Sequence, residues 1–257
     1  MITKSNVAEV VNSNYDILSR VQSQVASVKE LGMAFRNAPI EAIKQYIAKH
    51  ASLLMFPSND LAYGGLVTYR DGRFYVHINT KQPKVYENFI WAHEFYHLYF
   101  EAEDIKSSDV STYADGSALN ERERNANLFA AELLINREVL ADIYRGLCEM
   151  HPHDKLATQV IRLMPAFKLP YKALVIKLAQ DKLIEMHEAE EIIDYPYQQQ
   201  LPADFDSTLL LSSNSIQFDG IEELLQDATV KENMRATDYD TIAGLYAKHL
   251  TNFEKLL

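Results

Sequence analysis

The sequence has 257 residues, a formal net charge of −11 and a single cysteine, Cys148. A chain of this length can bury one sizeable core or two small ones. The lone cysteine excludes an internal disulfide, and the N-terminus lacks the pattern of a signal peptide, so we expect a reducing, cytoplasmic setting. No apolar run approaches the length that spans a bilayer, and we therefore expect no membrane association through a transmembrane helix.

The negative charge is concentrated in the last third of the chain. Residues 1–180 carry 20 acidic and 20 basic side chains, whereas residues 181–257 carry 16 acidic and 5 basic ones. Such a chain lacks the basic surface of a nucleic-acid-binding protein, so we expect no direct nucleic-acid partner. The acidic segment is either a solvated surface or a contact for a basic partner.

The N-terminal region predicts a long helix over residues 6–31. Its apolar residues repeat every seven positions, with Asn14 in the same seam. The pattern fits a short dimerising coiled coil or a helix packed on its own domain, and the second is favoured because the seam lasts barely four heptads. The oligomeric state stays open. A second helix is predicted over 39–50, with Pro39 in its first turn.

A β-hairpin is predicted next, with strands at 66–70 and 73–79 joined by Asp71-Gly72, a favoured two-residue turn. An apolar, aromatic helix follows over 85–100 and a polar loop over 102–119. A further helix spans 120–135, with Asn120 as its N-cap. Later helices are predicted at 137–149, 155–164, 171–193, 220–230 and 238–257.

The helix over 85–100 carries the sequence His93-Glu94-Phe95-Tyr96-His97. Residues four apart lie on one helix face, so His93 and His97 can bind one Zn²⁺ ion. Glu94 can reach the same face and accept a proton from a water molecule held by the metal. This spacing predicts a zinc site with a general base, and the alternative is a pair of hydrogen-bonded core histidines.

A catalytic zinc site needs a third protein ligand. Glu123 is the best candidate because its face of the helix over 120–135 carries small alanines that permit close helix packing. The alternative for Glu123 is a capping-box role. Glu121 lies on a more mixed face, and His151 and His153 lie in a loop that we expect to be exposed.

Two segments resemble a known family. Residues 91–97 read Trp-Ala-His-Glu-Phe-Tyr-His, and residues 123–134 read Glu-Arg-Asn-Ala-Asn-Leu-Phe-Ala-Ala-Glu-Leu-Leu. Together they resemble the A-H-E-x-x-H and E-x-x-A-N-x-F-A-A-x-L-L motifs of the ImmA/IrrE family of zinc metallopeptidases. The hairpin and residues 173–184 are also similar to that family, and the resemblance covers roughly residues 40–190.

The resemblance implies an α+β, mostly helical, zincin-like fold with a small β-sheet or hairpin before the zinc helix and a helical C-terminal region. It implies Zn²⁺ as cofactor, His93, His97 and Glu123 as ligands and Glu94 as general base. The substrate would be a cytoplasmic protein, typically a helix-turn-helix repressor of a phage, mobile element or stress regulon. We divide the chain into an N-terminal helical arm (1–35), a metallopeptidase core with a trailing helical subdomain (36–195) and an acidic C-terminal extension (196–257).

Two positions depart from the family pattern. Tyr96 stands where the family usually has glycine, so we expect different packing beneath the zinc helix, and Ile135-Asn136 replace the usual Met-Pro. In this interpretation the substrate adds to a free edge of the strand at 73–79. The expected donors to the oxyanion are Tyr86, Tyr113 or His77, and the sequence does not choose among them.

Two other functions compete with peptidase activity. The chain could be a non-catalytic zinc-containing interaction module that sequesters a regulator, although a purely structural site has no use for Glu94. It could also be a DNA-binding regulator acting through the helices at 155–184, but these are only modestly basic.

Overall fold

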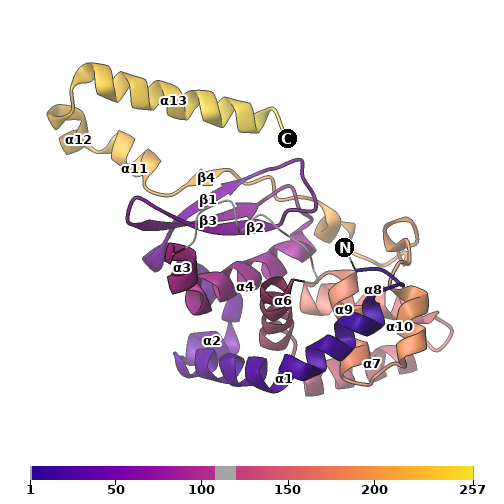
Figure 1. The fold of residues 1–257 in the computed structure, drawn as a ribbon. Helices are drawn as coiled ribbons and strands as arrows, with labels where there is room; N and C mark the ends of the chain where they lie inside the picture. Colours follow the sequence, from indigo (N-terminus) through magenta and orange to yellow (C-terminus); the bar gives the residue numbers. More distant parts are fainter. Residues whose placement is uncertain (1, 108–119, 257) are drawn as a thin grey trace.

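The computed structural model describes residues 2–107 and 120–256. Its fold is α+β, with one four-stranded mixed sheet and helices packed against it (Figure 1). The strands are β1 (Ser52–Phe56), β2 (Gly65–Arg70), β3 (Arg73–Asn79) and β4 (Gln217–Phe218). They lie in the order β2-β3-β1-β4, with β1 parallel to β3 and the other two pairs antiparallel.

The predicted hairpin is confirmed by β2 and β3. Asp71 and Gly72 have φ values of 49° and 80°, as a two-residue turn with both central residues left-handed requires. Strands β1 and β4 were not predicted from the sequence. Because β1 pairs with the other side of β3, the expectation of a free edge along 73–79 is wrong. Within the described residues, β2 is the end strand on the hairpin side.

The helices largely follow the predicted ranges. They are α1 (Val7–Glu30), α2 (Met33–Asn37), α3 (Pro39–His50), α4 (Lys84–Phe100), α5 (Ala102–Ser107), α6 (Glu121–Leu134), α7 (Arg137–Met150), α8 (Leu156–Phe167), α9 (Tyr171–Gln180), α10 (Met186–Ile192), α11 (Ile221–Gln226), α12 (Ala228–Asn233) and α13 (Ala236–Glu254). Short 3-10 turns lie at Tyr197–Gln199 and Ser207–Leu210. No helix in the described ranges is long and apolar enough to cross a bilayer.

Three predicted segments differ from the structure. Residues 102–107 form a helix rather than the start of a polar loop. The single helix expected over 171–193 is broken, because Lys182 takes a left-handed φ of 59° between α9 and α10. The helix expected over 220–230 divides at Asp227, whose carboxylate caps α12 by accepting hydrogen bonds from the backbone N–H groups of Thr229 and Val230.

Helix α1 packs on its own domain and contributes to two hydrophobic cores. Its C-terminal half, including Val21 and Val28, lies in a core formed with the sheet, α3, α4 and α6. Its N-terminal half, including Val7 and Val11, lies in a second core formed mainly by α8, α9 and α10. Burial of apolar side chains along both halves explains why the seam is regular.

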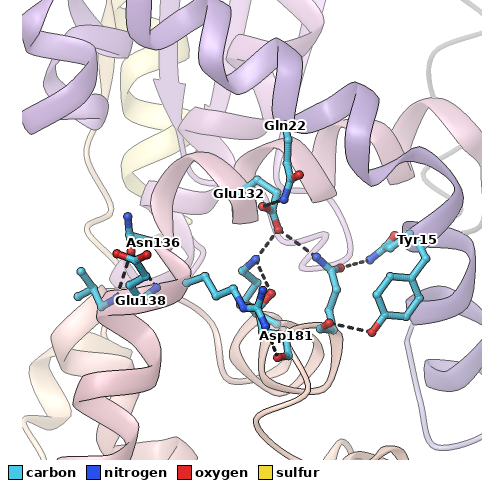
Figure 2. A network of polar contacts seen from close by, with 11 residues as sticks. Tyr15, Gln22, Glu132, Asn136, Glu138 and Asp181 are labelled. Atoms are coloured by element: carbon cyan, nitrogen blue, oxygen red, sulfur yellow. Dashed lines mark hydrogen bonds and ion pairs between the residues drawn. The ribbon is translucent and has the colours of Figure 1, made fainter.

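A buried polar network joins α1, α6 and α9 (Figure 2). Lys177 on α9 forms ion pairs with Glu132 on α6 and with Asp181. The amide of Gln180 donates to Glu132 and accepts from Asn14 of α1, and the Gln22 amide also donates to Glu132. The network therefore connects the N-terminal helix α1 to α6 and α9.

Helices α11, α12 and α13 of the C-terminal extension lie on the side of the sheet away from α4 (Figure 1). The Phe56 ring of β1 stacks on Phe253 of α13, with centroids 4.4 Å apart, and Phe218 of β4 lies in the same aromatic group. Residues 211–215 also hydrogen-bond with residues 80–84, which connect β3 to α4. This segment therefore supports the connection that leads into α4.

Candidate metal centre

Close packing of helices α4 and α6 brings the side chains of the two sequence motifs together. On α4, Ala92 and Phe95 are fully buried, and on α6 the small Ala126 and Ala130 are fully buried as well. Small side chains at a helix contact let the two backbones approach, and their burial fixes the rotation of each helix. The faces that carry His93 and His97 on α4 and Glu123 on α6 therefore meet.

The Nε2 atoms of both histidines converge on the Glu123 carboxylate. The His93 Nε2 atom lies 3.2 Å from Glu123 Oε2, and the His97 Nε2 atom lies 3.6 Å from Glu123 Oε1. The two Nε2 atoms are 3.1 Å apart. Within the described residues, these three side chains form the one group of three or more metal-binding side chains whose ligand atoms all lie within 4.8 Å.

The other nitrogen of each histidine is held by an acceptor. The His97 Nδ1 atom lies 2.8 Å from Glu101 Oε2, and the His93 Nδ1 atom lies 3.0 Å from Asn127 Oδ1. When both rings are neutral and each Nδ1 donates to its acceptor, a lone pair is left on each Nε2. Two lone pairs and a carboxylate facing one another repel unless a cation lies among them.

The donor set fits zinc. Tetrahedral zinc binds imidazole nitrogens at roughly 2.0–2.1 Å, which places two such nitrogens about 3.3 Å apart. The observed Nε2 separation of 3.1 Å is close to this value. Two imidazoles and one carboxylate are also the ligand types of a catalytic zinc site with a fourth position for water.

Burial and charge shift the pKa values at this site. Burial alone would lower the pKa of His93, but its hydrogen bond to Glu123 and the charges of Glu94 and Glu123 outweigh burial and raise it. Burial would raise the pKa of Glu123, but the hydrogen bond and charge of His93 lower it. In Glu94 burial prevails over the two histidines, so the pKa of this carboxyl is raised. A buried carboxylate of raised pKa is a stronger base.

Glu94 and Glu123 both lie close to the two histidines. Glu94 is 3% exposed on the same helix as both histidines, and its carboxylate lies against the start of β2. Asn120 is the N-cap of α6 and accepts a hydrogen bond from the Arg122 N–H group, while the Glu123 carboxylate faces the histidines. The catalytic and ligand roles of these residues remain predictions.

The other candidate residues lie elsewhere. Glu121 is 66% exposed and lies 3.8 Å from Arg20, and neither His151 nor His153 belongs to the metal-binding group. His77 is buried on the far face of the sheet, stacked between Phe56 and Tyr63, so it is not placed to contact an oxyanion at the metal centre.

Tyr86 also has a hydrogen-bond partner away from the metal centre. It lies in the first turn of α4, two turns before His93, and its partly buried phenol is hydrogen-bonded to Tyr197. Tyr113 lies outside the described residues. None of the described candidates is therefore placed as an oxyanion donor.

Three supporting residues were missed by the sequence interpretation. Glu101 and Asn127 accept hydrogen bonds from the Nδ1 atoms of the two histidines. Arg122 donates two hydrogen bonds, of 3.1 and 2.9 Å, to Glu101 Oε2. These outer contacts fix the tautomer and orientation of ligand histidines. A signal for Glu101 was present, because it follows His97 by the same four residues that separate His97 from His93.

The fold and this donor set define an H-E-x-x-H metallopeptidase-like protein, with the motif helix packed under a small mixed sheet. The chain belongs to the family of the IrrE N-terminal-like domain, Peptidase_M78, whose model matches residues 48–179. This match confirms the resemblance to the ImmA/IrrE family. No curated protein and no solved structure matches the chain.

Proposed function

We propose that the chain is a zinc-dependent endopeptidase whose general base is Glu94. The observation that carries this proposal is the convergence of two imidazole nitrogens and one carboxylate beside a second, buried carboxylate. A site that only held a structural metal would gain nothing from burying Glu94, because an uncompensated buried carboxylate costs free energy. The family match supports peptidase activity as the class of reaction.

Each residue of the site has a separate role in the proposed hydrolysis of a peptide bond. A zinc ion at this site supplies Lewis acidity to the scissile carbonyl and lowers the pKa of water. Glu94 takes the proton from the attacking water and delivers it to the leaving amine. Glu101 and Asn127 keep the imidazole rings turned toward the shared site throughout the reaction.

The substrate binds in this proposal along the outer edge of β2 rather than along β3. Strand β2 is the end strand on that side of the sheet within the described residues, and it begins at Gly65, beside Glu94. An extended peptide can add to such an edge through main-chain hydrogen bonds. Methylating one backbone nitrogen of a cleaved peptide should therefore raise KM, whereas equal cleavage at every methylated position would exclude strand addition.

We further propose a cytoplasmic protein as substrate, with a helix-turn-helix repressor of a phage, mobile element or stress regulon as the first class to test. This step rests on the family resemblance and on the single free cysteine. Incubation with purified repressors from the same genome, followed by mass spectrometry, tests it. Cleavage confined to proteins of other classes would contradict the choice of repressor.

The test of the catalytic proposal compares the wild type with His93→Ala and Glu94→Gln. We expect one zinc per chain in the wild type and in Glu94→Gln, and loss of zinc in His93→Ala. Cleavage of a proteome-derived peptide library should occur only with the wild type. Normal cleavage by Glu94→Gln would show that Glu94 is not the base.

The alternative is a zinc-containing interaction module that sequesters a regulator. The C-terminal extension favours this alternative, because Leu224, Ile242 and Leu245 are 56%, 42% and 51% exposed on its helices. Stoichiometric zinc without cleavage of any peptide or repressor, together with a stable complex lost in Ile242→Asp, would support the module. Cleavage by the wild type alone would reject it.

A further inference from the structure

The start of β2 lies unusually close to the Glu94 carboxylate. An ideal Cβ atom built on Gly65 would lie 2.7 Å from Glu94 Oε1, 2.8 Å from Glu94 Cδ and 2.7 Å from the backbone oxygen of His77. All three separations are below 3.0 Å, which real Cβ atoms essentially never show. The backbone of β2 at this point therefore forms a wall directly against the carboxylate.

Strand alternation explains why this position matters. Side chains two residues apart in a strand point to the same face. Val67 is 3% exposed and belongs to the core beneath the sheet, so a side chain at position 65 would point toward α4 as well. The sequence places no side chain there, and the Glu94 carboxylate lies in the space that results.

Space, rather than backbone conformation, requires a glycine at position 65. Among the described glycines, Gly72 and Gly220 take a left-handed φ, and Gly65 does not. An L-residue could adopt the backbone of Gly65 without strain, so the close approach is the reason for the glycine. Its neighbour Gly64 differs, since a Cβ there would meet the flexible side chain of Ile90 at 3.1 Å.

We propose that Gly65 is a positioning residue for the general base. The backbone at Gly65 limits the movement of the Glu94 carboxylate on the side of β2. A methyl group at position 65 displaces the carboxylate and leaves the three proposed metal ligands in place. The proposal rests on the proposed function, because it assigns a consequence to the position of the base.

The first experiment is steady-state cleavage of a library-derived peptide by Gly65→Ala. A displacement of about 1 Å at a reacting group lowers the rate on the order of 10²-fold. We expect a fall of this size in kcat, with KM within about twofold of the wild type and one zinc per chain retained. The matched control is Gly146→Ala on α7, where an added Cβ meets nothing within 4 Å, and it should cleave at the wild-type rate.

The second experiment detects the contact without using activity. The unfolding midpoint is measured for the wild type, Gly65→Ala, Glu94→Ala and the double variant. If the methyl group meets Glu94, the loss caused by Gly65→Ala should be clearly smaller when Glu94 is already truncated. Equal losses in both backgrounds would place the clash on the His77 carbonyl alone and overturn the proposal.

The outcomes separate this proposal from the proposed function. A wild type that holds zinc and cleaves no peptide contradicts the peptidase function itself. A wild type that cleaves, with Gly65→Ala cleaving equally fast, contradicts only the role of Gly65. Should Gly65→Ala not fold, recovery of folded protein in the double variant supports the contact with Glu94, and continued failure to fold overturns it.

Discussion

The two ends of helix α6 each carry a partly buried glutamate in a cluster of ionisable groups, and the two clusters are built differently. At the C-terminal end, Glu132 meets the ammonium group of Lys177, which also lies 3.0 Å from Asp181. At the N-terminal end, Glu123 meets the Nε2 atoms of two histidines. The first cluster contains the lysine cation, whereas the second brings together three side chains that could bind a metal ion.

This difference separates a structural cluster from a binding site. The Glu132 carboxylate accepts hydrogen bonds from the amides of Gln22 and Gln180 in addition to its ion pair (Figure 2). Such a cluster holds helices in register without any ligand. The Glu123 cluster has its outer nitrogens satisfied and its inner atoms facing one another. Only a proton or a metal ion can neutralise it, and the geometry fits a metal.

The largest effect is expected from removing an acceptor of the second cluster. Glu123→Ala leaves two imidazoles, and a site with two protein ligands no longer meets the coordination of a catalytic zinc. We expect zinc in the dialysed protein to fall from one per chain to background, by elemental analysis. Glu121→Ala is the matched control two residues earlier, since Glu121 is 66% exposed. Full zinc content in Glu123→Ala would remove Glu123 from the ligand set.

Removing the cation of the first cluster should lower the stability of the protein and leave its zinc content unchanged. Lys177→Met leaves Glu132 and Asp181 buried without the ammonium group, and removing one partner of a buried pair typically costs about 3–5 kcal/mol. We expect a loss of this size in the free energy of unfolding by denaturant, with zinc retained. Lys172→Met on the same helix is the control.

The ammonium group of Lys172 lies 2.8 Å from Asp194 in a more exposed pair, so this control should cost less than about 1 kcal/mol. Loss of zinc in Lys177→Met at a temperature where the protein is folded would mean that the two clusters are not independent. A cost for Lys177→Met as small as for Lys172→Met would mean that the first cluster contributes little to stability.

His77 is a third buried ionisable group, and it differs from the two clusters on α6 because both its hydrogen-bond partners are neutral. Its Nε2–H donates to the Phe56 carbonyl at 3.2 Å, so Nδ1 accepts from the Tyr63 hydroxyl. Burial lowers the pKa of His77 to about 4, although the bond to Phe56 opposes this shift. The unfolded chain, with a pKa near 6.5, binds this proton at higher pH than the folded one.

The sign of the pH effect follows from that difference. Between pH 6.5 and pH 4 the unfolded state gains a proton at His77 and the folded state does not, so stability falls as the pH falls. The loss attributable to His77 approaches about 3 kcal/mol at pH 4. Subtracting the urea-derived stability profile of His77→Gln from that of the wild type isolates this loss. Parallel profiles would contradict the lowered pKa.

The sequence predicted the elements whose signal is local. The turn at Asp71-Gly72, the N-cap at Asn120 and the four-residue spacing of His93 and His97 each depend on neighbouring residues, and the structure confirms their geometry. It did not predict β4, because two residues pair with β1 from more than 150 positions away. The free edge was assigned to the wrong strand for the same reason, since β1 carries no hairpin signal.

The metal centre shows the same division between local and distant information. Glu123 could be chosen as a candidate ligand because its helix has a recognisable face, and the structure places its carboxylate beside both histidines. The contribution of Gly65 could not be predicted, because it depends on how closely β2 approaches α4. The break after α9 was missed because Lys182, a residue without turn preference, takes the left-handed conformation there.

The smallest predicted effect concerns the outer contacts of the metal centre. In the wild type, Glu101 accepts hydrogen bonds from His97 and from two N–H groups of Arg122. Burial would raise the pKa of Glu101, but the bonds from His97 and Arg122 lower it, so the group is a carboxylate at neutral pH. Glu101→Gln removes this charge and weakens the orientation of the His97 ring.

Loss of an outer contact of this kind typically lowers metal affinity 10–100-fold, or about 1.4–2.7 kcal/mol. We expect Glu101→Gln to bind zinc that much more weakly in competition with a chromophoric chelator, while still binding one ion per chain. Glu103→Gln is the control, because Glu103 lies two residues later, is 85% exposed and pairs with Lys106. Equal affinities in both variants would show that His97 is oriented by packing alone, since Tyr96 and Phe95 bury the same turn of α4.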